Sequence, residues 1–488
     1  MTVPTVCGAA KLKNVLYFVI DDLRPQLGAY DQHETYTPNI DKLAKQALVF
    51  ERAYCQQSVC APSRNSFMTG RRPDTSKVWN FIDHFREKGV GLNWSSMPQY
   101  FKEHGYFSSG VGKVFHKNLP PNFDPPSWSD LSQFPWYYGD PGHCPKNTSW
   151  CALPRDHPFC DVNSTSIIIE RLRYVAQNNS GPFFLAVGFH KPHLPWAFPE
   201  EFIKQYPNQS AISVAKFLYI PTGMPYIAFY NGMRPHKYSD LHRYTHNITT
   251  PYPVTVQQQL RRGYYAATTY MDSLVGKVLD ELDRLGLSND TIVALHGDHG
   301  YQLGEHNEWA KHTNFELATR VPFMIRVPWQ PDTAGKKTSA LVELVDVFPT
   351  LVELAGLPPC QENLDGLSLV PLFHNQTKTV KAAALSQYPR CGDYKNGNAD
   401  VCLHTNRSQF NYMGYSMRTD RYRYTEWVKW NGTKLEGDWH GLVARELYDH
   451  QGDDGNDFNA FENENIAESQ PEIVKELSLK LRNIFSKH

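Results

Sequence analysis

Short apolar runs alternate with amphipathic stretches over most of the chain. Three runs, 15–20, 183–188 and 291–295, are apolar at nearly every position, which is typical of parallel strands buried on both faces. Between them, apolar residues recur at helical spacing, most clearly over 254–285. Because strands and helices alternate, the pattern predicts an α/β fold in which a large, mostly parallel central sheet is flanked by helices.

Residues typical of helix ends mark the limits of several predicted elements. Thr37 followed by Pro38 is typical of an N-cap and a first helical position. Gly286 follows the long amphipathic stretch, and Gly356 follows the apolar run 347–355, so both are typical C-cap residues. We therefore expect three helices with these limits.

The pattern changes beyond Leu372. Aromatic and charged residues alternate there, as in 422–428, and turn residues become frequent, which predicts antiparallel strands. A last helix is expected from about Pro471. We therefore expect a large domain over residues 1–372 and a smaller C-terminal α+β domain, with an antiparallel sheet, over residues 373–488.

Composition limits the partners of the chain. It has 488 residues, 41% of them hydrophobic, which is enough to bury a sizeable core. The formal net charge is -1, so no global positive field attracts a polyanion, and any attraction must be local to a pocket. The sequence shows no nucleic-acid-binding motif and no apolar run long enough to span a bilayer. We therefore expect neither a nucleic-acid partner nor membrane insertion.

Residues of metal-binding type follow two of the predicted strands. Asp21 and Asp22 come directly after the first apolar run, and Asp298 and His299 follow the run 291–295 through His296-Gly297. The carboxyl ends of parallel strands meet at one edge of a sheet, where open α/β sheets bind ligands. Hard cations such as Ca²⁺ prefer several carboxylate oxygens. Each pair alone is more typical of a turn or a helix cap, and only together with the pattern around Cys60 do the pairs indicate a metal site at this edge.

A second pattern surrounds Cys60. The run Cys-Ala-Pro-Ser-Arg over 60–64 is followed by Thr-Gly-Arg-Arg over 69–72, and together they resemble the signature of the sulfatase family. The resemblance implies that the formylglycine-generating enzyme oxidises Cys60 to formylglycine before folding is complete. The hydrate of this aldehyde would supply the oxygen that attacks sulfur. The fixed charge of Arg64 would stabilise that oxygen in its ionised form.

The same resemblance implies roles for other residues. One calcium ion would be bound by Asp21, Asp22, Asp298, His299 and the modified Cys60. The sulfate pocket would also contain Lys113, His116, His193 and Lys311. Either His193 or Lys311 would donate a proton to the leaving group. His116 would take a proton from the remaining hydroxyl of the hydrate, so that sulfate is expelled. Which of these groups is the acid and which the base stays open.

Longer stretches resemble those sulfatases that remove the 2-O-sulfate from terminal iduronate of heparan and dermatan sulfate. These stretches are 15–25, 60–75, 183–195, 297–315, 386–390 and 413–419. His299 favours this reading, because most sulfatases have asparagine at the corresponding metal-ligand position. Arg390 is the candidate for binding the iduronate carboxylate with two hydrogen bonds, and a salt bridge between the two domains is the alternative. Tyr301, where related enzymes have tryptophan, is a second tentative substrate contact, and 119–161 matches them poorly. A sulfated glycosaminoglycan oligosaccharide is the expected partner. The smaller domain would contribute to the rim of the site that binds it.

Three other functions stay in view. Another sulfatase, acting on a sulfamate, a glucosamine sulfate or choline sulfate, would differ only in the rim of the site. A metal-dependent phosphodiesterase would normally have Ser or Thr in place of Cys60. A non-catalytic glycan-binding relative would lack the nucleophile or its metal ligands, and here all of them are present.

Asparagines and cysteines indicate the compartment. Many Asn-X-Ser/Thr sequons occur, including those at Asn93, Asn147, Asn163, Asn208, Asn247, Asn289, Asn375 and Asn431. They suit a chain that passes through the secretory pathway to the lysosome or is secreted. Apart from Cys60 there are eight cysteines, and we favour disulfides Cys144–Cys151 and Cys391–Cys402, leaving Cys7, Cys55, Cys160 and Cys360 unassigned. Residues 1–14 lack the apolar segment of a signal peptide, so we expect a trimmed or incomplete start.

Overall fold

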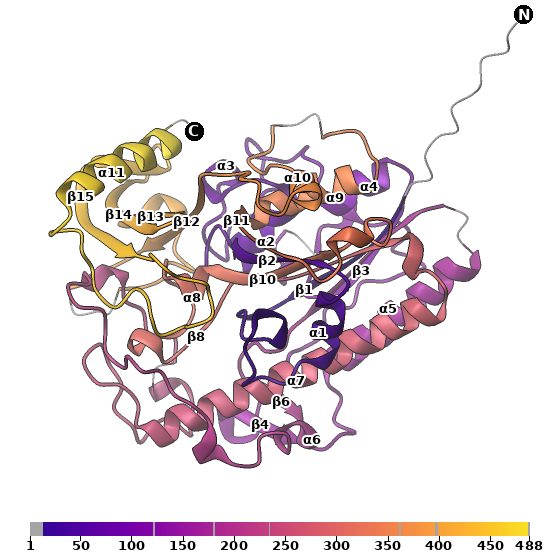
Figure 1. Cartoon of the computed structure of the whole chain (residues 1–488), viewed down its shortest axis with the longest axis horizontal. Helices are drawn as coiled ribbons and strands as arrows, with labels where there is room; N and C mark the ends of the chain where they lie inside the picture. Colours follow the sequence, from indigo (N-terminus) through magenta and orange to yellow (C-terminus); the bar gives the residue numbers. More distant parts are fainter. Residues whose placement is uncertain are drawn as a thin grey trace, which may run out of the picture.

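A seven-stranded sheet forms the centre of the computed structural model, which describes residues 13–120, 123–178, 181–233, 235–360, 363–395 and 399–486. The strand order is β11-β2-β10-β7-β1-β5-β3 (Figure 1). The strands are β1 (Asn14–Ile20), β2 (Leu48–Tyr54), β3 (Phe107–Gly112), β5 (Phe183–Phe189), β7 (Thr291–Gly297), β10 (Arg320–Arg326) and β11 (Lys337–Glu343). Neighbouring strands are parallel except at β10, which is antiparallel to both β2 and β7. The predicted mostly parallel sheet is confirmed.

Helices cover both faces of this sheet. The helices α1 (Pro38–Ala44), α5 (Cys160–Asn178) and α7 (Val254–Arg284) lie on one face, and α2 (Cys60–Thr69), α4 (Met97–Glu103) and α9 (Val347–Leu354) lie on the other (Figure 1). Side chains of β1 alternate between two hydrophobic clusters, with Leu16 and Phe18 in one and Val15 and Tyr17 in the other. The first apolar run is therefore apolar throughout because both of its faces are buried.

All three predicted helix limits are confirmed. Gly286 and Gly356 adopt the left-handed backbone conformation, with φ of 70° and 78°, just beyond α7 and α9. Thr37 is the N-cap residue of α1 and Pro38 is its first residue, although the Thr37 side chain makes no capping hydrogen bond. Its hydroxyl instead hydrogen-bonds to Asp41, whose carboxylate also accepts the backbone N–H of Ala29.

A four-stranded antiparallel sheet follows at the C-terminal end. Its order is β12-β13-β14-β15, with β12 (Ala383–Arg390), β13 (Tyr412–Thr419), β14 (Tyr422–Asn431) and β15 (Glu436–Asp449). The final helix α11 (Pro471–Phe485) packs on this sheet through Leu477 and Leu481, as Figure 1 shows in yellow. The antiparallel C-terminal part is confirmed, and the boundary between residues 372 and 373 stays a prediction.

Smaller elements complete the described chain. They are α3 (Pro73–Ser76), β4 (Trp150–Leu153), β6 (Trp196–Pro199), α6 (Glu200–Ile203), β8 (Gln302–Leu303), β9 (Trp309–Ala310), α8 (Glu316–Thr319) and α10 (Val370–His374). No helix in the described part is both long enough and apolar enough to cross a membrane.

Covalent features agree with the expectations wherever they can be compared. Both favoured disulfides, Cys144–Cys151 and Cys391–Cys402, are present. Cys55 and Cys160 are buried outside any disulfide, and Cys7 lies outside the described residues. The sequon asparagines are exposed, apart from the half-buried Asn431.

A network of buried ion pairs joins the C-terminal sheet to α8, the helix directly before β10 of the central sheet. Arg418 Nε on β13 donates to Glu316 Oε2 on α8 at 3.1 Å, and Arg423 Nε on β14 donates to Glu462 Oε1 at 2.6 Å. His450 lies in the same network, with Nδ1 at 2.7 Å from Asp453 Oδ2 and Nε2 at 3.2 Å from Glu462 Oε1. Removing one partner of such a buried pair typically costs about 3–5 kcal/mol, because the other charge stays buried.

His450 makes the stability of this network depend on pH. Burial and the charge of Arg418 act to lower the pKa of His450, but its bonds to Asp453 and Glu462 outweigh them and raise it above 6.5. Its contribution is therefore complete below about pH 6.5 and is lost as pH rises through the higher pKa of the folded state. We expect His450→Gln to flatten this fall in the free energy of unfolding, measured by denaturant titration from pH 5 to 8.

The exposed His440 of β15 provides the matched control, because His440→Gln changes the same residue type without touching the network. If His450→Gln and His440→Gln gave the same pH dependence, the assignment would be wrong.

Candidate active site

The ends of two neighbouring strands bring the acidic residues together. Parallel pairing sets Ile20 of β1 opposite Gly297 of β7, and Asp298 N continues the ladder by donating to Ile20 O at 3.0 Å. Asp21 and Asp298, the next residues of each strand, therefore lie side by side at the carboxyl edge of the sheet. The sequence-based prediction of convergence at this edge agrees with the geometry.

The turn after β1 is held in an unusual backbone conformation. Asp22 has φ of 57°, in the left-handed region that a residue with a side chain adopts only at a cost. Its N–H donates to Asp298 Oδ1 at 3.1 Å, and its carbonyl accepts the Tyr264 hydroxyl at 2.8 Å. Sequence reasoning missed Tyr264, because it lies within the amphipathic pattern of α7 and gives no local signal.

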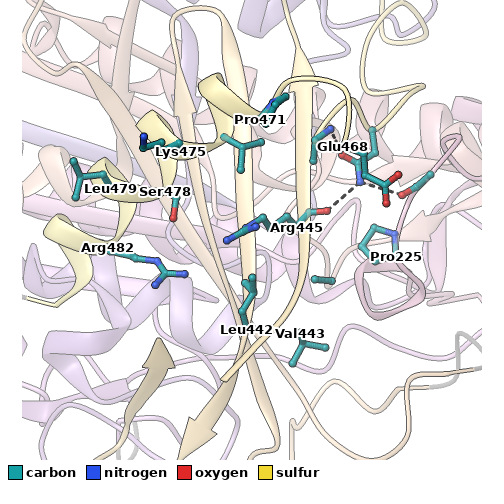
Figure 2. Close-up of a pocket in the computed structure, with 15 residues that line it drawn as sticks. Pro225, Leu442, Val443, Arg445, Glu468, Pro471, Lys475, Ser478, Leu479 and Arg482 are labelled. Carbon is teal, nitrogen blue, oxygen red and sulfur yellow. Dashed lines mark hydrogen bonds between the residues drawn. The ribbon is translucent and has the colours of Figure 1, made fainter. Parts of the chain in front are cut away.

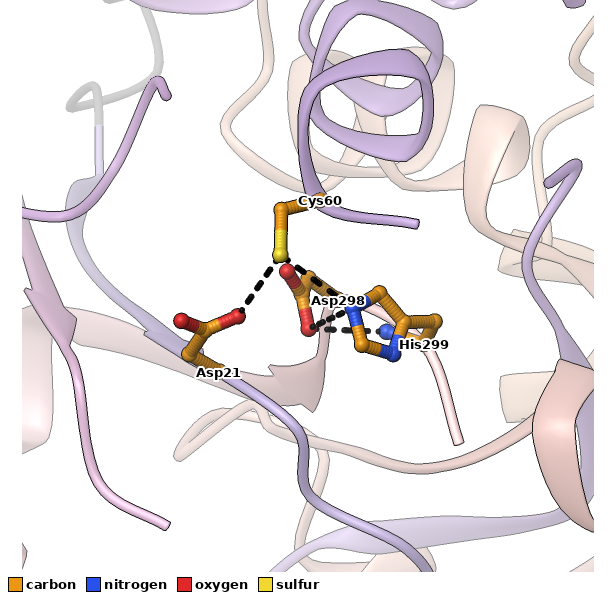
Figure 3. A group of neighbouring side chains, drawn as sticks. All are labelled: Asp21, Cys60, Asp298 and His299. Atoms are coloured by element: carbon orange, nitrogen blue, oxygen red, sulfur yellow. Dashed lines mark hydrogen bonds and ion pairs between the residues drawn. The ribbon is translucent and has the colours of Figure 1, made fainter. Parts of the chain in front are cut away.

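Cys60 is the first residue of α2 and faces this cluster. Its Sγ lies 3.3 Å from Asp21 Oδ1 and 3.5 Å from His299 Nε2, as Figure 3 shows. The possible ligand atoms of Asp21, Cys60, Asp298 and His299 all lie within 4.8 Å of one another, and all four residues are buried. Four groups that are far apart in the sequence thus converge on one point.

Hydrogen bonds orient both histidines of the cluster. His299 Nδ1 lies 2.9 Å from Gly300 O, so this nitrogen carries the proton and Nε2 presents its lone pair to the cluster. His193 Nδ1 faces Leu194 O in the same way. His193 also forms a compact group with Asp21, Asp22 and Cys60, whose possible ligand atoms lie within 4.8 Å of one another.

Three cations surround Cys60 and neutralise the carboxylates. Arg64 Nε donates to Asp298 Oδ2 at 3.0 Å. Lys113 Nζ forms an ion pair with Asp21 and lies 3.7 Å from Cys60 Sγ. Lys311 Nζ forms an ion pair with Asp22 and lies 3.2 Å from the same sulfur. The site therefore presents positive donors on the side from which an anion would approach Cys60.

Glycines at two strand ends allow Lys113 to reach the site. Gly112 has φ of 74°, and a Cβ there would lie 2.1 Å from Gly188 O. A Cβ on Gly188 would lie 2.1 Å from the carbonyl carbon of Lys113. Lys113 N donates to Gly188 O at 2.9 Å, which fixes the backbone from which its side chain extends. A side chain at either glycine would displace Lys113.

The charge balance of the cluster fits a divalent cation. Burial and the neighbouring charge of Asp21 raise the pKa of Asp22 to about 6 and that of Asp298 to about 7. A cation at this point would relieve the repulsion between these carboxylates. Carboxylate oxygens form most of the donor set, as Ca²⁺ prefers, and an oxygen on an oxidised Cys60 would add another. The residues present therefore fit the metal that the sequence implies.

The Cys60 thiol is not suited to act as a nucleophile without modification. Burial and the charge of Asp21 raise its pKa to about 12, so the thiolate is scarce at neutral or acidic pH. The oxidation that the sequence signature implies would replace this thiol by the hydroxyls of an aldehyde hydrate, and it stays a prediction.

His116 lies beside the cluster rather than within it. Its ring stacks on Phe81 with centroids 4.5 Å apart, and burial together with Lys113 and Arg64 lowers its pKa to about 3. Its Nδ1 has no hydrogen-bond partner among the described residues. A neutral imidazole in this position has the protonation state that a base requires.

The two tentative substrate residues are fully buried. Tyr301 stacks on Tyr264 with ring centroids 5.4 Å apart. Arg390 donates through Nε to Ile227 O at 3.0 Å and through Nη2 to Ala228 O at 3.2 Å. No carboxylate of the described residues lies within ion-pair distance of Arg390, so the alternative of an interdomain salt bridge is wrong. Arg390 instead joins β12 to residues 227–228 through their backbone carbonyls.

A surface groove of about 970 Å³ lies elsewhere, between β15 and α11 (Figure 2). It is lined by Leu442 and Arg445 on one side and by Lys475 and Leu479 on the other. No residue of the buried cluster lines it. The convergent charged groups therefore identify the candidate active site, and the groove is separate from it.

Comparisons with known proteins agree with this geometry. The family model described as Sulfatase matches residues 13–357, and one described as N-sulphoglucosamine sulphohydrolase, C-terminal, matches 304–484. The chain is 38% identical to the iduronate 2-sulfatase of Mus musculus, over 93% of this chain and 92% of that protein. It is 37% identical to the iduronate 2-sulfatase of Homo sapiens, over 92% and 91%.

Solved structures confirm the fold. A phosphonate monoester hydrolase from Silicibacter pomeroyi superimposes with a TM-score of 0.73 at 18% identity, covering 97% of this chain and 96% of that one. The resemblance seen around Cys60 is therefore confirmed over both parts of the chain. The chain belongs to the sulfatase family of sulfuric ester hydrolases.

Proposed function

We propose that this sulfatase removes the 2-O-sulfate from terminal iduronate of heparan and dermatan sulfate, with one calcium ion and with Cys60 converted to formylglycine. The observation that carries the proposal is the convergence of Asp21, Asp298 and His299 on Cys60, with Lys311 Nζ 3.2 Å from its sulfur. The substrate follows from similarity to two iduronate 2-sulfatases over nearly the whole chain.

The residues of the chain divide into two groups in this proposal. Asp21, Asp22, Asp298, His299 and the oxidised Cys60 would hold the calcium ion, which supplies positive charge where negative charge develops. The formylglycine hydrate supplies the oxygen that attacks sulfur. Arg64, already bonded to Asp298, keeps a fixed positive charge beside that oxygen.

The second group binds the sulfate ester and moves protons. Lys113 and Lys311 lie 3.7 and 3.2 Å from Cys60 Sγ, so both would contact sulfate oxygens during attack. Lys311, or His193 in its imidazolium form, would donate a proton to the departing sugar oxygen, and His116 would accept the proton that accompanies release of sulfate. Rates of variants of His193 and of Lys311, measured on substrates whose leaving groups differ in basicity, would show which of the two is the acid.

The last part of the proposal concerns the substrate contacts at the rim of the site and the cellular compartment. Arg390, the last residue of β12, would bind the uronate carboxylate. The C-terminal part would thereby contribute to specificity. Exposed sequons and two disulfides support a path through the secretory pathway, to the lysosome or to the outside. The formylglycine-generating enzyme would act on the chain during that path.

A second candidate is a sulfatase for another glycosaminoglycan sulfate. The match of residues 304–484 to the C-terminal model of N-sulphoglucosamine sulphohydrolase favours keeping it. The same purified protein assayed on both substrate types decides between the two.

The first prediction concerns Cys60. Peptide mass spectrometry of active protein from a cell with the generating enzyme should show formylglycine at this position. Cys60→Ala should remove turnover and keep the fold, and Cys60→Ser should stall as a sulfated serine, because a single hydroxyl cannot form an aldehyde to release sulfate. Cys55→Ala is the matched control, since Cys55 is also buried outside any disulfide. Active protein with an unmodified Cys60 thiol would contradict the proposal.

The second prediction concerns the metal. Calcium at 100 times its dissociation constant should stabilise the protein by about 2.7 kcal/mol, seen as a rise in Tm that a chelator reverses. Asp298→Asn should remove this rise. Asp346→Asn should keep it, because the buried Asp346 pairs with Lys381 rather than with the cluster. Full activity after exhaustive chelation would overturn the metal assignment.

The third prediction concerns the sugar. Assays on sulfated disaccharides that differ in uronate and sulfate position should show the highest kcat/KM for 2-O-sulfated terminal iduronate. Arg390→Lys should raise KM for this substrate roughly tenfold, the cost of a lost charge-assisted hydrogen bond, with little change for a small uncharged aryl sulfate. Equal loss on both substrates with a lower Tm would assign Arg390 to structure. Preference for an N-sulfated glucosamine would select the second candidate.

A further inference from the structure

A group of buried polar residues holds the start of the loop that carries His193. Asp161 is the second residue of α5, and His190 and Lys191 directly follow β5. Asp161, His190 and Lys191 are all at most 2% exposed. None of them belongs to the cluster around Cys60, and the sequence motifs gave them no role.

The Asp161 carboxylate holds the start of the loop with both oxygens. Its Oδ1 accepts the backbone N–H of His190 at 2.9 Å and lies 3.2 Å from His190 Nδ1. Its Oδ2 accepts the backbone N–H of Lys191 at 2.9 Å. Burial acts to raise the pKa of Asp161, but its bonds to His190 and Lys191 outweigh burial and lower it, so the carboxylate is ionised. Three donors on two consecutive residues fix the path of the chain as it leaves β5.

A second anchor holds the far end of the same loop. Lys191 Nζ donates to His193 O at 3.0 Å and to Pro195 O at 2.7 Å. His193 N donates to His190 O at 2.8 Å, which closes a turn. The backbone of His193 is therefore bonded on both sides, which fixes the point from which its imidazole extends, and the contact of Nδ1 with Leu194 O orients the ring.

We propose that Asp161 is a positioning residue for the sulfatase reaction, which acts by fixing the loop His190–Pro195 so that His193 faces Cys60. Lys191 is its partner at the other end of the loop. Asp161 itself does not touch the substrate. The inference rests on the role proposed above for His193 in the sulfate pocket.

The geometry explains why a carboxylate is needed here. Asparagine has the same shape but one acceptor oxygen, so its NH₂ group would face one of the two backbone N–H groups and leave it unpaired. A buried unpaired donor costs about 1–3 kcal/mol, which the loop can avoid by shifting. A shift of about 1 Å in a group that acts on the substrate can cost about a hundredfold in rate.

The test is a double-mutant cycle between Asp161 and His193. Asp161→Asn should lower kcat/KM by roughly 10- to 100-fold, as changes to outer partners of site residues do. In the His193→Gln background the same change should cost less than about twofold, because the residue through which Asp161 acts is gone. Asp161→Asn should also reproduce the His193→Gln change in the ratio of activities on a sugar sulfate and on an activated aryl sulfate.

Asp272 on α7 offers a matched control. Its two carboxylate oxygens likewise accept consecutive backbone N–H groups, those of Asn39 and Ile40, at 3.2 and 2.8 Å, far from His193 in the sequence. Asp272→Asn should lower the free energy of unfolding by a similar amount without changing the ratio of activities. Should Asp161→Asn fail to fold, Lys191→Met removes the other anchor and is expected to show the same coupling to His193.

The outcomes separate the two proposals. Multiplicative effects of Asp161→Asn and His193→Gln, or a ratio of activities unchanged by Asp161→Asn, overturn the positioning role. If His193→Gln alone leaves kcat and KM unchanged, the role of His193 in the proposed function is the one that fails.

Discussion

Several carboxylates buried within one small volume are the constraint on which the rest of this site depends. Two like charges 4 Å apart repel by about 4 kcal/mol at an effective dielectric constant of 20. Asp21, Asp22 and Asp298 lie together in a buried cluster, where burial and the neighbouring charge of Asp21 raise the pKa values of Asp22 and Asp298. Arg64, Lys113 and Lys311 offset the repulsion in the protein alone, and they also bring positive charge to the place where a sulfate would bind.

Regular backbone pairing turns this set of charges into a precise geometry. Parallel ladders place the ends of β1, β5 and β7 at one edge, and each ends in a residue whose backbone is still hydrogen-bonded to its neighbour strand. Where the chain leaves the ladder, a specific side chain takes over, as Tyr264 does for the turn at Asp22 and Asp161 for the loop after β5. Positions on rigid elements with such support hold functional groups more accurately than free loops do.

Much of the fold and of the cluster could be predicted from the sequence, because short-range patterns encode them. Apolar runs locate the strands, and Asp21 or Asp298 at the end of a run identifies an edge without knowledge of the partner strand. Tyr264 and Asp161 could not be predicted, because their roles depend on a backbone group far away in the sequence. The position of Thr37 at the N-cap was predicted, but the hydrogen bond of its hydroxyl to Asp41 was not, because spacing alone does not rank competing acceptors. The direction of His116 and the contacts of Arg390 likewise depend on Phe81 and on residues 227–228.

The segment between Asp298 and Glu316 joins the site to the C-terminal sheet at closely spaced points. His312 bonds to Tyr388 of β12 at 2.6 Å, Asn314 donates to Gly414 O of β13 at 3.0 Å, and Glu316 pairs with Arg418. The same short segment carries Asp298, His299 and Lys311. We therefore expect the active site and the C-terminal sheet to unfold together. Substitutions that loosen the C-terminal sheet would act on the site by depopulating its ordered state, and would look in a cell like defects of abundance rather than of chemistry.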